Sequence, residues 1–581
     1  MDPPPLPPPS APAPLPMRSS RATLANVIGW PAVAVLGVGY LILIARLTSF
    51  PFEDFPDHLA RAAVMADLLF HHGERWGAIF SFHWTLVPYL LPDLLLTSLV
   101  AALGTTAGGL VFLELTVLAL PCALLYSMHV NRLAPQARPL VVLVSLYLAT
   151  DWFFLVGFAA FRFAVPLIIV CLALADALRQ RWSGRLYAVY LAAVFAGYLD
   201  HLTVLAFLAA ALTMSAAVRI AFGRASAREE MRLLLPVLLL LALFLAVLAG
   251  PHHAASPGVY TLDWGTVSQK LTRLQNEFFR YGGRSDRPMI LLLAFSLFWP
   301  VRRELPSRRL LEPAVLEQLA LAVTFLGIYA VLPGTYSGAA YVDVRALPMV
   351  VIFVLFAVLR LAPAGARANG FGGAPALAAA AVLAGVNLGY VGWHLLRDNA
   401  WMQRYRQVAA AVPRGSVVLP VYTFPPTGVP LEHGSSFVLL DRQGLIPYLF
   451  AGNRGDPMSY FSFRRHPYAP VAQWYLLQRQ WDRAPVFTFR NQGESYRWRF
   501  RYDKYEHDWK PAVLAPVSWS RIACDYSYIL VTEPYDPAYI RVPTRPVTAN
   551  ASAALLAIDR GGCPAATAAP APPRIPPQVT Y

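Results

Sequence analysis

The chain has 581 residues, of which 57% are hydrophobic and only 14% are charged. Soluble proteins carry about 25% charged residues, so this composition excludes an ordinary soluble protein. The apolar residues form runs of about 17–25, long enough to cross a bilayer. The formal net charge of +15 does not indicate nucleic-acid binding, because the arginines lie mainly between these runs, where they set orientation, and in the C-terminal part.

The two ends of the chain are predicted to be disordered tails. Residues 1–22 begin with a stretch that is more than half proline, and residues 563–581 are rich in proline and alanine. The first apolar run is long and ends at Phe50-Pro51 rather than at a small-residue cleavage site. We therefore expect a retained first helix with its N-terminus in the cytoplasm.

Twelve apolar segments are predicted, at about 26–47, 86–103, 107–129, 139–157, 162–178, 186–199, 202–219, 233–250, 288–300, 314–332, 346–361 and 375–396. Arginine-rich connectors at 179–185, 219–232, 302–309 and 360–367 belong in the cytoplasm by the positive-inside rule. The C-terminal part then lies outside. An even number of crossings would leave both ends of the chain on the same side, so we expect eleven or thirteen crossings. The missed or wrongly counted segment is expected between residues 58 and 138.

The predicted architecture is a mainly α transmembrane bundle at 23–396, with an acidic first outer loop at 48–85, and a soluble α/β or α+β outer domain at 397–562. Strands are predicted at 417–421, 437–440, 486–489 and 528–531, and helices at 401–412 and 469–480. If this domain lies outside the cytoplasm, a disulfide between Cys524 and Cys563 is plausible. No spacing typical of a zinc site is present.

The stretch Phe50–Arg61 holds Glu53, Asp54, Asp57 and His58 directly after the first span. Pro56 can open a helix over 57–70, on which His58 and Arg61 share a face. We expect this helix to lie on the membrane interface. A carboxylate there can act as a general base or help hold a divalent metal. The alternative is that Asp54 caps the helix, with Asp57 three residues later.

This layout resembles the glycosyltransferase C superfamily of membrane enzymes. The shared features are a first span leading into an acidic outer loop, here Glu53-Asp54-Phe-Pro-Asp57-His58, then juxtamembrane helices, many spans and a soluble outer domain. The stretch Pro-Tyr-Leu-Leu-Pro-Asp at 88–93 is similar to the start of the second span in bacterial members. The resemblance implies sugar transfer from a polyprenyl-phosphate carrier, with Asp54 as the first catalytic candidate and Glu53 and Asp57 as alternates. The Phe-Pro spacer and the trailing His58 depart from the family pattern.

Three further pairs of charged residues are predicted at outer membrane edges. Arg162 can pair with a carrier phosphate, or simply with Asp151. Asp200 and His201 can form a substrate or proton-relay site, or an exposed turn. Arg345 is the second candidate phosphate ligand, and its alternative role is an ion pair with Asp343 at a helix start. The substrate-binding candidates are therefore His58, Arg61, Asp151, Arg162, Asp200, His201, Asp343 and Arg345, with no metal ligand assigned.

The leading hypothesis is a glycosyltransferase of a bacterial inner membrane that acts on an envelope acceptor. Its partners are a lipid-linked sugar donor and membrane lipids, without nucleic acid. The cofactor is unknown, and a divalent metal is left open. The alternatives are a transporter or flippase, or a non-catalytic assembly protein for envelope polymers. Convergence of Asp54, Asp57, Asp200, His201 and Arg345 on one outer cavity favours the enzyme.

Overall fold

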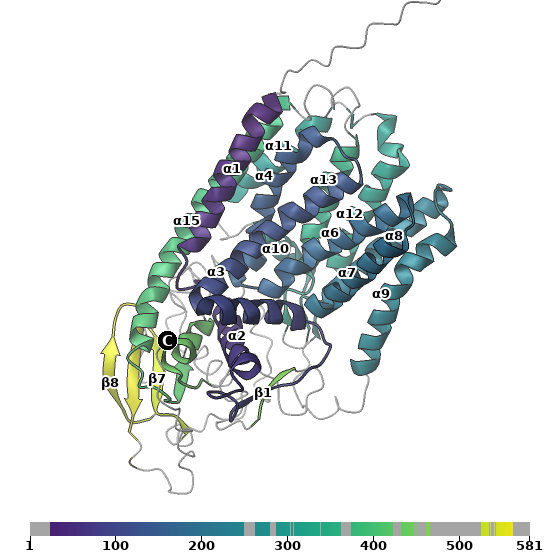
Figure 1. Cartoon of the computed structure of the whole chain (residues 1–581). Coiled ribbons are helices and arrows are strands. Elements are labelled where there is room, and N and C mark those ends of the chain that lie inside the picture. The colour runs from purple at the N-terminus through teal and green to yellow at the C-terminus, as the bar shows by residue number, and fades with distance from the viewer. Residues whose placement is uncertain are drawn as a thin grey trace, which may run out of the picture.

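The computed structural model describes residues 24–248, 262–278, 286–302, 304–305, 307–336, 339–361, 373–421, 432–446, 460–464, 525–533 and 542–559, and single residues 449, 535, 540 and 561. Most of these residues are helical. The predicted bundle is thus confirmed, with a small sheet near the C-terminus (Figure 1). The two tails, the segments 469–480 and 486–489, and Cys524 and Cys563 lie outside the described residues.

Seven helices among the described residues are long and apolar enough to cross a membrane. They are α1 (Leu24–Ala45), α3 (Leu90–Val130), α6 (Ala159–Gln180), α8 (Leu202–Ala221), α12 (Pro313–Val331), α13 (Leu347–Leu361) and α15 (Gly373–Ala409). The bundle also contains α4 (Arg138–Ala149), α7 (Gly184–Asp200), α9 (Ala227–Leu248) and α11 (Arg287–Phe298). By helix length and composition, the chain is a multi-pass membrane protein.

Helix α3 is two helices joined by a sharp turn at Gly104, whose φ of 81° and ψ of 168° are non-helical. The chain folds back there so tightly that a Cβ on Gly108 would lie 2.7 Å from the carbonyl carbon of Leu99. Both helices lie beside the acidic loop, because Asp93 in the first contacts Arg61, and Gly109 near the start of the second packs against Phe50. Residues 90–103 therefore do not cross the bundle. Without this segment, eleven of the twelve predicted segments remain as candidate passes, and an odd number is what the predicted placement of the two ends requires.

Helix α2 (Phe55–Phe70) begins where predicted, with a proline at its start. The prediction that it lies on the membrane interface is wrong. Eleven of its residues are buried, including Asp57 and Arg61. One side packs against α3, and η7 (Glu432–Ser436) and α16 (Phe437–Arg442) cover another. The amphipathic pattern reflects a helix enclosed between the bundle and the C-terminal part (Figure 1).

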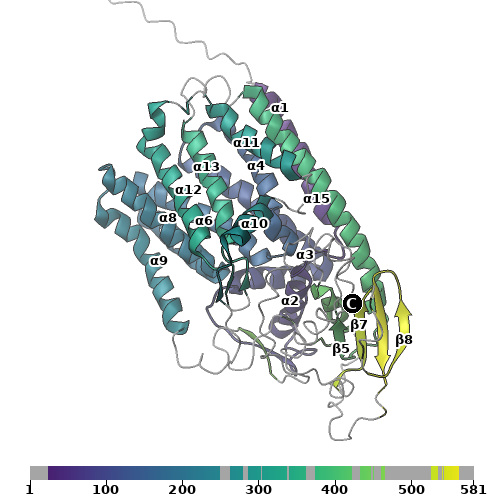
Figure 2. The same ribbon diagram turned by 180° about the vertical axis from the view of Figure 1, so that it is seen from behind.

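Helix α15 continues past the predicted domain boundary at residue 396 and connects the bundle to the C-terminal part (Figure 2). It ends beside a four-stranded sheet with the order β5-β7-β9-β8. These strands are β5 (Val418–Val421), β7 (Tyr528–Thr532), β9 (Ala553–Ile558) and β8 (Thr544–Ala549). Only β5 and β7 pair in parallel. The strands predicted at 417–421 and 528–531 are confirmed, whereas 437–440 belongs to α16.

A second, two-stranded pairing ties the first loop to the C-terminal part. Strand β1 (Phe80–Phe82) runs antiparallel to β6 (Phe461–Phe463), with Phe80 opposite Phe463. The rings of Phe80 and Phe461 stack at 5.2 Å. A further small sheet joins β2 (Leu262–Asp263), β3 (Thr335–Tyr336) and β4 (Ala339–Ala340). The pairing of β1 with β6 thus fixes two segments that are almost 400 positions apart in the sequence beside α2.

Candidate functional site

The acidic loop is held in place by its backbone. The backbone N–H of Asp54 donates to the carbonyl of Val156 at 3.0 Å, which fixes the loop against the end of α5 (Trp152–Val156). The next residue, Gly157, has φ +85°, and a Cβ there would lie 2.8 Å from the backbone nitrogen of Phe55. Glycine is the residue that combines this backbone conformation with so close an approach.

The carboxylates of Asp54 and Asp57 flank one imidazole from the C-terminal part. His433 Nε2 lies 3.4 Å from Asp54 Oδ1, and His433 Nδ1 lies 3.2 Å from Asp57 Oδ2. Ser436 donates its hydroxyl to the other oxygen of Asp57. Asp54 occupies the N-cap position of α2, but its side chain makes no capping hydrogen bond. The capping alternative therefore does not account for this carboxylate.

Asp54 and Asp57 differ in their access to solvent. The Asp57 side chain is fully buried, whereas 19% of the Asp54 side chain is exposed. Burial raises the pKa of Asp54, and the neighbouring charge of His433 opposes that rise. A carboxylate with a raised pKa and partial access is suited to accept a proton from a substrate. Glu53 is half-buried beside it.

His58 and Arg61 turn toward a second acid, Asp93. Arg61 Nη2 lies 2.5 Å from Asp93 Oδ2, and His58 Nδ1 lies 3.8 Å from Asp93 Oδ1. Tyr460, next to β6, donates its hydroxyl to the same carboxylate. The Tyr460 hydroxyl also lies 3.0 Å from the carbonyl oxygen of Tyr89. This cluster joins α2, the start of α3 and the C-terminal part.

His201 and Arg345 meet directly. Arg345 Nη1 lies 2.8 Å from His201 Nε2, and the Tyr89 hydroxyl lies 3.0 Å from the same nitrogen. Because a guanidinium can only donate, Nε2 is an acceptor and the imidazole is neutral. Burial and the Arg345 charge lower the pKa of His201 well below its ordinary value. The rings of Phe158 and Phe161 each lie 5.5 Å from the guanidinium carbon. Asp200 is buried and reaches this group through its backbone, since its carbonyl accepts from Tyr89 N–H.

The remaining two predicted acids form structural pairs. Asp151 accepts from the backbone N–H of Phe154 at 3.0 Å and lies 2.5 Å from Arg162 Nη1, with both side chains buried. Asp343 pairs with Lys270 on α10 (Val267–Phe278) at 3.2 Å and also caps η6 (Val344–Ala346). For both acids the ion-pair alternative describes the observed contacts, although the partner of Asp343 is Lys270 rather than Arg345.

The structure therefore brings most of the predicted site residues to one end of the bundle. The Arg345 charge also favours the ionised form of Asp54, although less than His433 and His58 do. The resulting polar network, which we call the outer network, contains Asp54, Asp57, His58, Arg61, Tyr89, Asp93, His201, Arg345, His433, Ser436 and Tyr460. Sequence reasoning missed Tyr89, Asp93, His433, Ser436 and Tyr460 as site residues. Asp93 and Tyr89 lie in the 88–93 stretch that carried the resemblance, but no local signal marks His433.

Among the described residues, no group of three or more His, Cys, Asp or Glu side chains is arranged to hold a metal ion. The cysteines described, Cys122 and Cys171, are free thiols.

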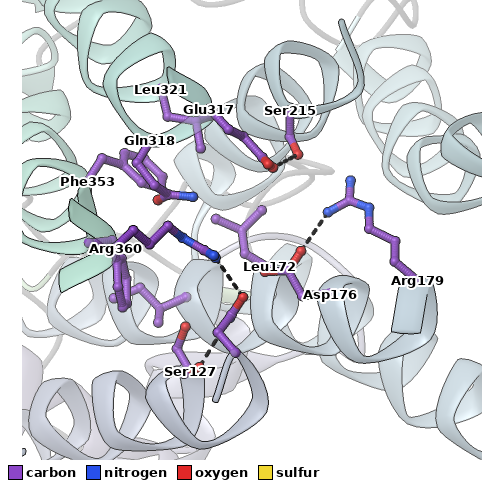
Figure 3. Close-up of a pocket in the computed structure, with 13 residues that line it drawn as sticks. Ser127, Leu172, Asp176, Arg179, Ser215, Glu317, Gln318, Leu321, Phe353 and Arg360 are labelled. Atoms are coloured by element: carbon purple, nitrogen blue, oxygen red, sulfur yellow. Dashed lines mark hydrogen bonds and ion pairs between the residues drawn. The ribbon is translucent and has the colours of Figure 1, made fainter. Parts of the chain in front are cut away.

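Asp176, Glu317 and Arg360 are among the residues that line a pocket between the helices of the bundle (Figure 3). Arg179, which lines it, is about 25 Å along α6 from Arg162 at 1.5 Å per residue. The pocket has a volume of about 30 Å³, which is room for about two water molecules. Around it Arg179 contacts Asp176 at 2.9 Å, and Arg219 contacts Asp176 at 3.1 Å and Glu317 at 2.9 Å. These pairs join α6, α8 and α12, and the acids are already matched by arginines. The pocket is thus separate from the outer network.

No family model and no curated protein matches the chain. Two solved structures of ArnT from Cupriavidus metallidurans are similar to it. The one described as bound to undecaprenyl phosphate has a TM-score of 0.46 and 12% identity, over 91% of this chain and 98% of its own. The one described as in the apo state has a TM-score of 0.46 and 11% identity, over 94% and 99%.

Proposed function

We propose that this chain is a membrane glycosyltransferase that moves a sugar from a polyprenyl-phosphate carrier to an envelope acceptor on the outer face of a bacterial inner membrane. The observation that carries the proposal is the outer network. In it, a partly exposed carboxylate with a raised pKa, Asp54, lies within reach of the charge of Arg345. A base and a phosphate ligand are the two groups that this transfer requires from the protein.

The orientation in this proposal follows the positive-inside rule. The arginine-rich connectors and the N-terminus are cytoplasmic, and the acidic loop at 48–85 and the domain at 397–562 are periplasmic. The lipid carrier then reaches the outer network from the outer leaflet, and the acceptor reaches it from the periplasm.

In the proposed reaction, a hydroxyl of the acceptor attacks the anomeric carbon of the donor sugar. The bond between that carbon and the phosphate oxygen breaks, and both of its electrons leave with the carrier phosphate. Asp54 takes the proton of the attacking hydroxyl. Arg345 holds the charge that develops on the departing phosphate, for which a guanidinium is a suitable donor.

The direct test is transfer by the purified protein in lipid nanodiscs. The donor is a radiolabelled polyprenyl-phosphate sugar, and a bacterial envelope extract supplies acceptors. Label should move from the lipid phase to the acceptor only with active protein. If the protein exchanges or moves the intact lipid across the bilayer without breaking the sugar–phosphate bond, the glycosyltransferase proposal is wrong and the flippase alternative gains.

Arg345 gives a prediction about the donor. Arg345→Met should raise the KM for the lipid-linked donor by about 10- to 100-fold, as expected for loss of a charged hydrogen bond worth about 1.5–3 kcal/mol. Arg345→Lys keeps the charge but loses the planar fork of the guanidinium, so its KM should lie between those of the wild type and Arg345→Met. Arg360→Met is the matched control, because Arg360 lies about 22 Å farther along the same helical segment and lines the other pocket. Equal KM changes in Arg345→Met and Arg360→Met would remove Arg345 from the donor site.

A further inference from the structure

His433 stands at the centre of the acidic loop although it comes from the C-terminal part. Its two ring nitrogens face two carboxylates, Asp54 at 3.4 Å and Asp57 at 3.2 Å. The histidine side chain is 9% exposed, and the Asp57 side chain is fully buried. Ser436, three residues later on the same short helix, donates to Asp57. The order from inside to outside is therefore Ser436, Asp57, His433, Asp54.

The protonation of the imidazole follows from this placement. A neutral imidazole has one N–H and one lone pair, so it would present its lone pair to one of the two carboxylates. An imidazolium carries an N–H on both sides and attracts both. Between two acids in a buried setting, the charged form is the one that the arrangement stabilises.

We infer that His433 is a positioning residue that Asp57 and Ser436 hold in place, and that its imidazolium fixes one carboxylate oxygen of Asp54 and keeps that carboxylate ionised. The other oxygen of Asp54 is then left to take a proton from the acceptor. The inference rests on the proposed function, because it assigns His433 a role in preparing the proposed base. It also gives the C-terminal part a share in the site itself.

Several charged or titratable groups act on Asp54 besides its burial. His433 from η7, His58 from α2 and Arg345 from η6 favour the ionised carboxylate, whereas Asp57 from α2 opposes it. His433 is the strongest of these. Removing it should therefore raise the pKa of Asp54. Removing the Asp57 charge from a protein that already lacks His433 should lower that pKa again, because only the repulsion between the two carboxylates is then lost. The two changes have opposite signs, which a general loss of structure would not produce.

The experiment measures transfer from the labelled lipid-linked donor between pH 5 and 9. Because the base must be ionised, activity falls as the pH drops through the pKa of Asp54. In His433→Gln this acid limb should move up by at least about one unit, since an opposite charge at this range lowers a carboxylate pKa by about 1–3 units. Activity should be about tenfold below wild type on the acid side and recover toward it at high pH. In His433→Gln/Asp57→Asn the limb should lie below that of His433→Gln.

His83→Gln is the control, because His83 belongs to the same loop but is exposed. Its acid limb should coincide with that of the wild type. An unchanged limb in His433→Gln, or a limb in His433→Gln/Asp57→Asn that lies at or above that of His433→Gln, overturns the inference. If His433→Gln does not fold, His433→Asn takes its place with the same expected limb.

Failure of the inference is distinguishable from failure of the proposed function. A wild-type protein that transfers no sugar overturns the function and the inference together. A wild-type protein that transfers sugar overturns the inference alone if Asp54→Asn transfers equally well, or if Asp54→Asn is inactive and the acid limb does not shift in His433→Gln.

Discussion

Asp54→Asn should reduce sugar transfer by about 10²- to 10⁴-fold, the range that a positioned general base contributes. The amide has nearly the same shape, keeps a carbonyl oxygen toward His433 and cannot take a proton. The backbone contact of Asp54 with Val156 does not involve the side chain, so the loop should keep its conformation. The measurement is the single-turnover rate with saturating lipid-linked donor in nanodiscs.

A measurement of donor binding distinguishes a variant that has lost the proton-transfer step from a variant whose site is disrupted. Asp54→Asn should bind the lipid-linked donor about as tightly as wild type, because Arg345 and His201 are untouched. Glu53→Gln is the matched control, since Glu53 is the neighbouring half-buried acid, and it should cost less than about threefold. An inactive Glu53→Gln together with an active Asp54→Asn would move the base to Glu53. An active Asp54→Asn variant would exclude Asp54 as the base.

The bundle could be predicted from the sequence because run length alone identifies helices in a membrane protein. The same runs hid the nature of residues 90–103, which are apolar but fold back at Gly104 to lie beside the acidic loop. Hydropathy measures the apolar character of a segment and carries no information about its direction. The even number of predicted crossings did not fit the predicted placement of the two ends. That conflict indicated that one segment between residues 58 and 138 differed from the rest.

Only part of the site could be predicted from the sequence. Topology placed the acidic loop, His201 and Arg345 on one side, and the structure brings them together through the contact of His201 with Arg345 and the charge of Arg345 acting on Asp54. His433 and Tyr460 could not be found in this way. They reach the site through tertiary contacts across more than 360 positions, and a lone histidine or tyrosine in a polar domain has no spacing that marks it.

The misjudged elements have a common physical cause. Helix α2 has one polar and one apolar side, a pattern shared by interfacial helices and by helices whose polar side meets a buried ionic cluster. Here the polar side carries Asp57 and Arg61, which are matched by His433 and Asp93. The stretch at 437–440 is short and apolar, and such runs do not distinguish a strand from a buried helix.

Arg162→Met should destabilise the protein by about 3–5 kcal/mol, the cost of leaving one member of a buried ion pair without its partner. Arg162 and Asp151 are 3% and 1% exposed, and their atoms lie 2.5 Å apart. Asp151 also caps α5 through Phe154. The measurement is the unfolding midpoint of the purified protein at fixed detergent or lipid concentration, together with activity per folded molecule.

The double variant Asp151→Asn/Arg162→Met should recover most of the lost stability, because asparagine still caps α5 and no buried charge remains. If Arg162 serves only this pair, the folded fraction of either variant should keep the wild-type KM for the lipid-linked donor. The contrast with Arg345 is then sharp, since both arginines lie near the outer end of the bundle and only one should affect the donor. A stable Arg162→Met variant with a raised donor KM would instead make Arg162 a phosphate ligand and Asp151 its support.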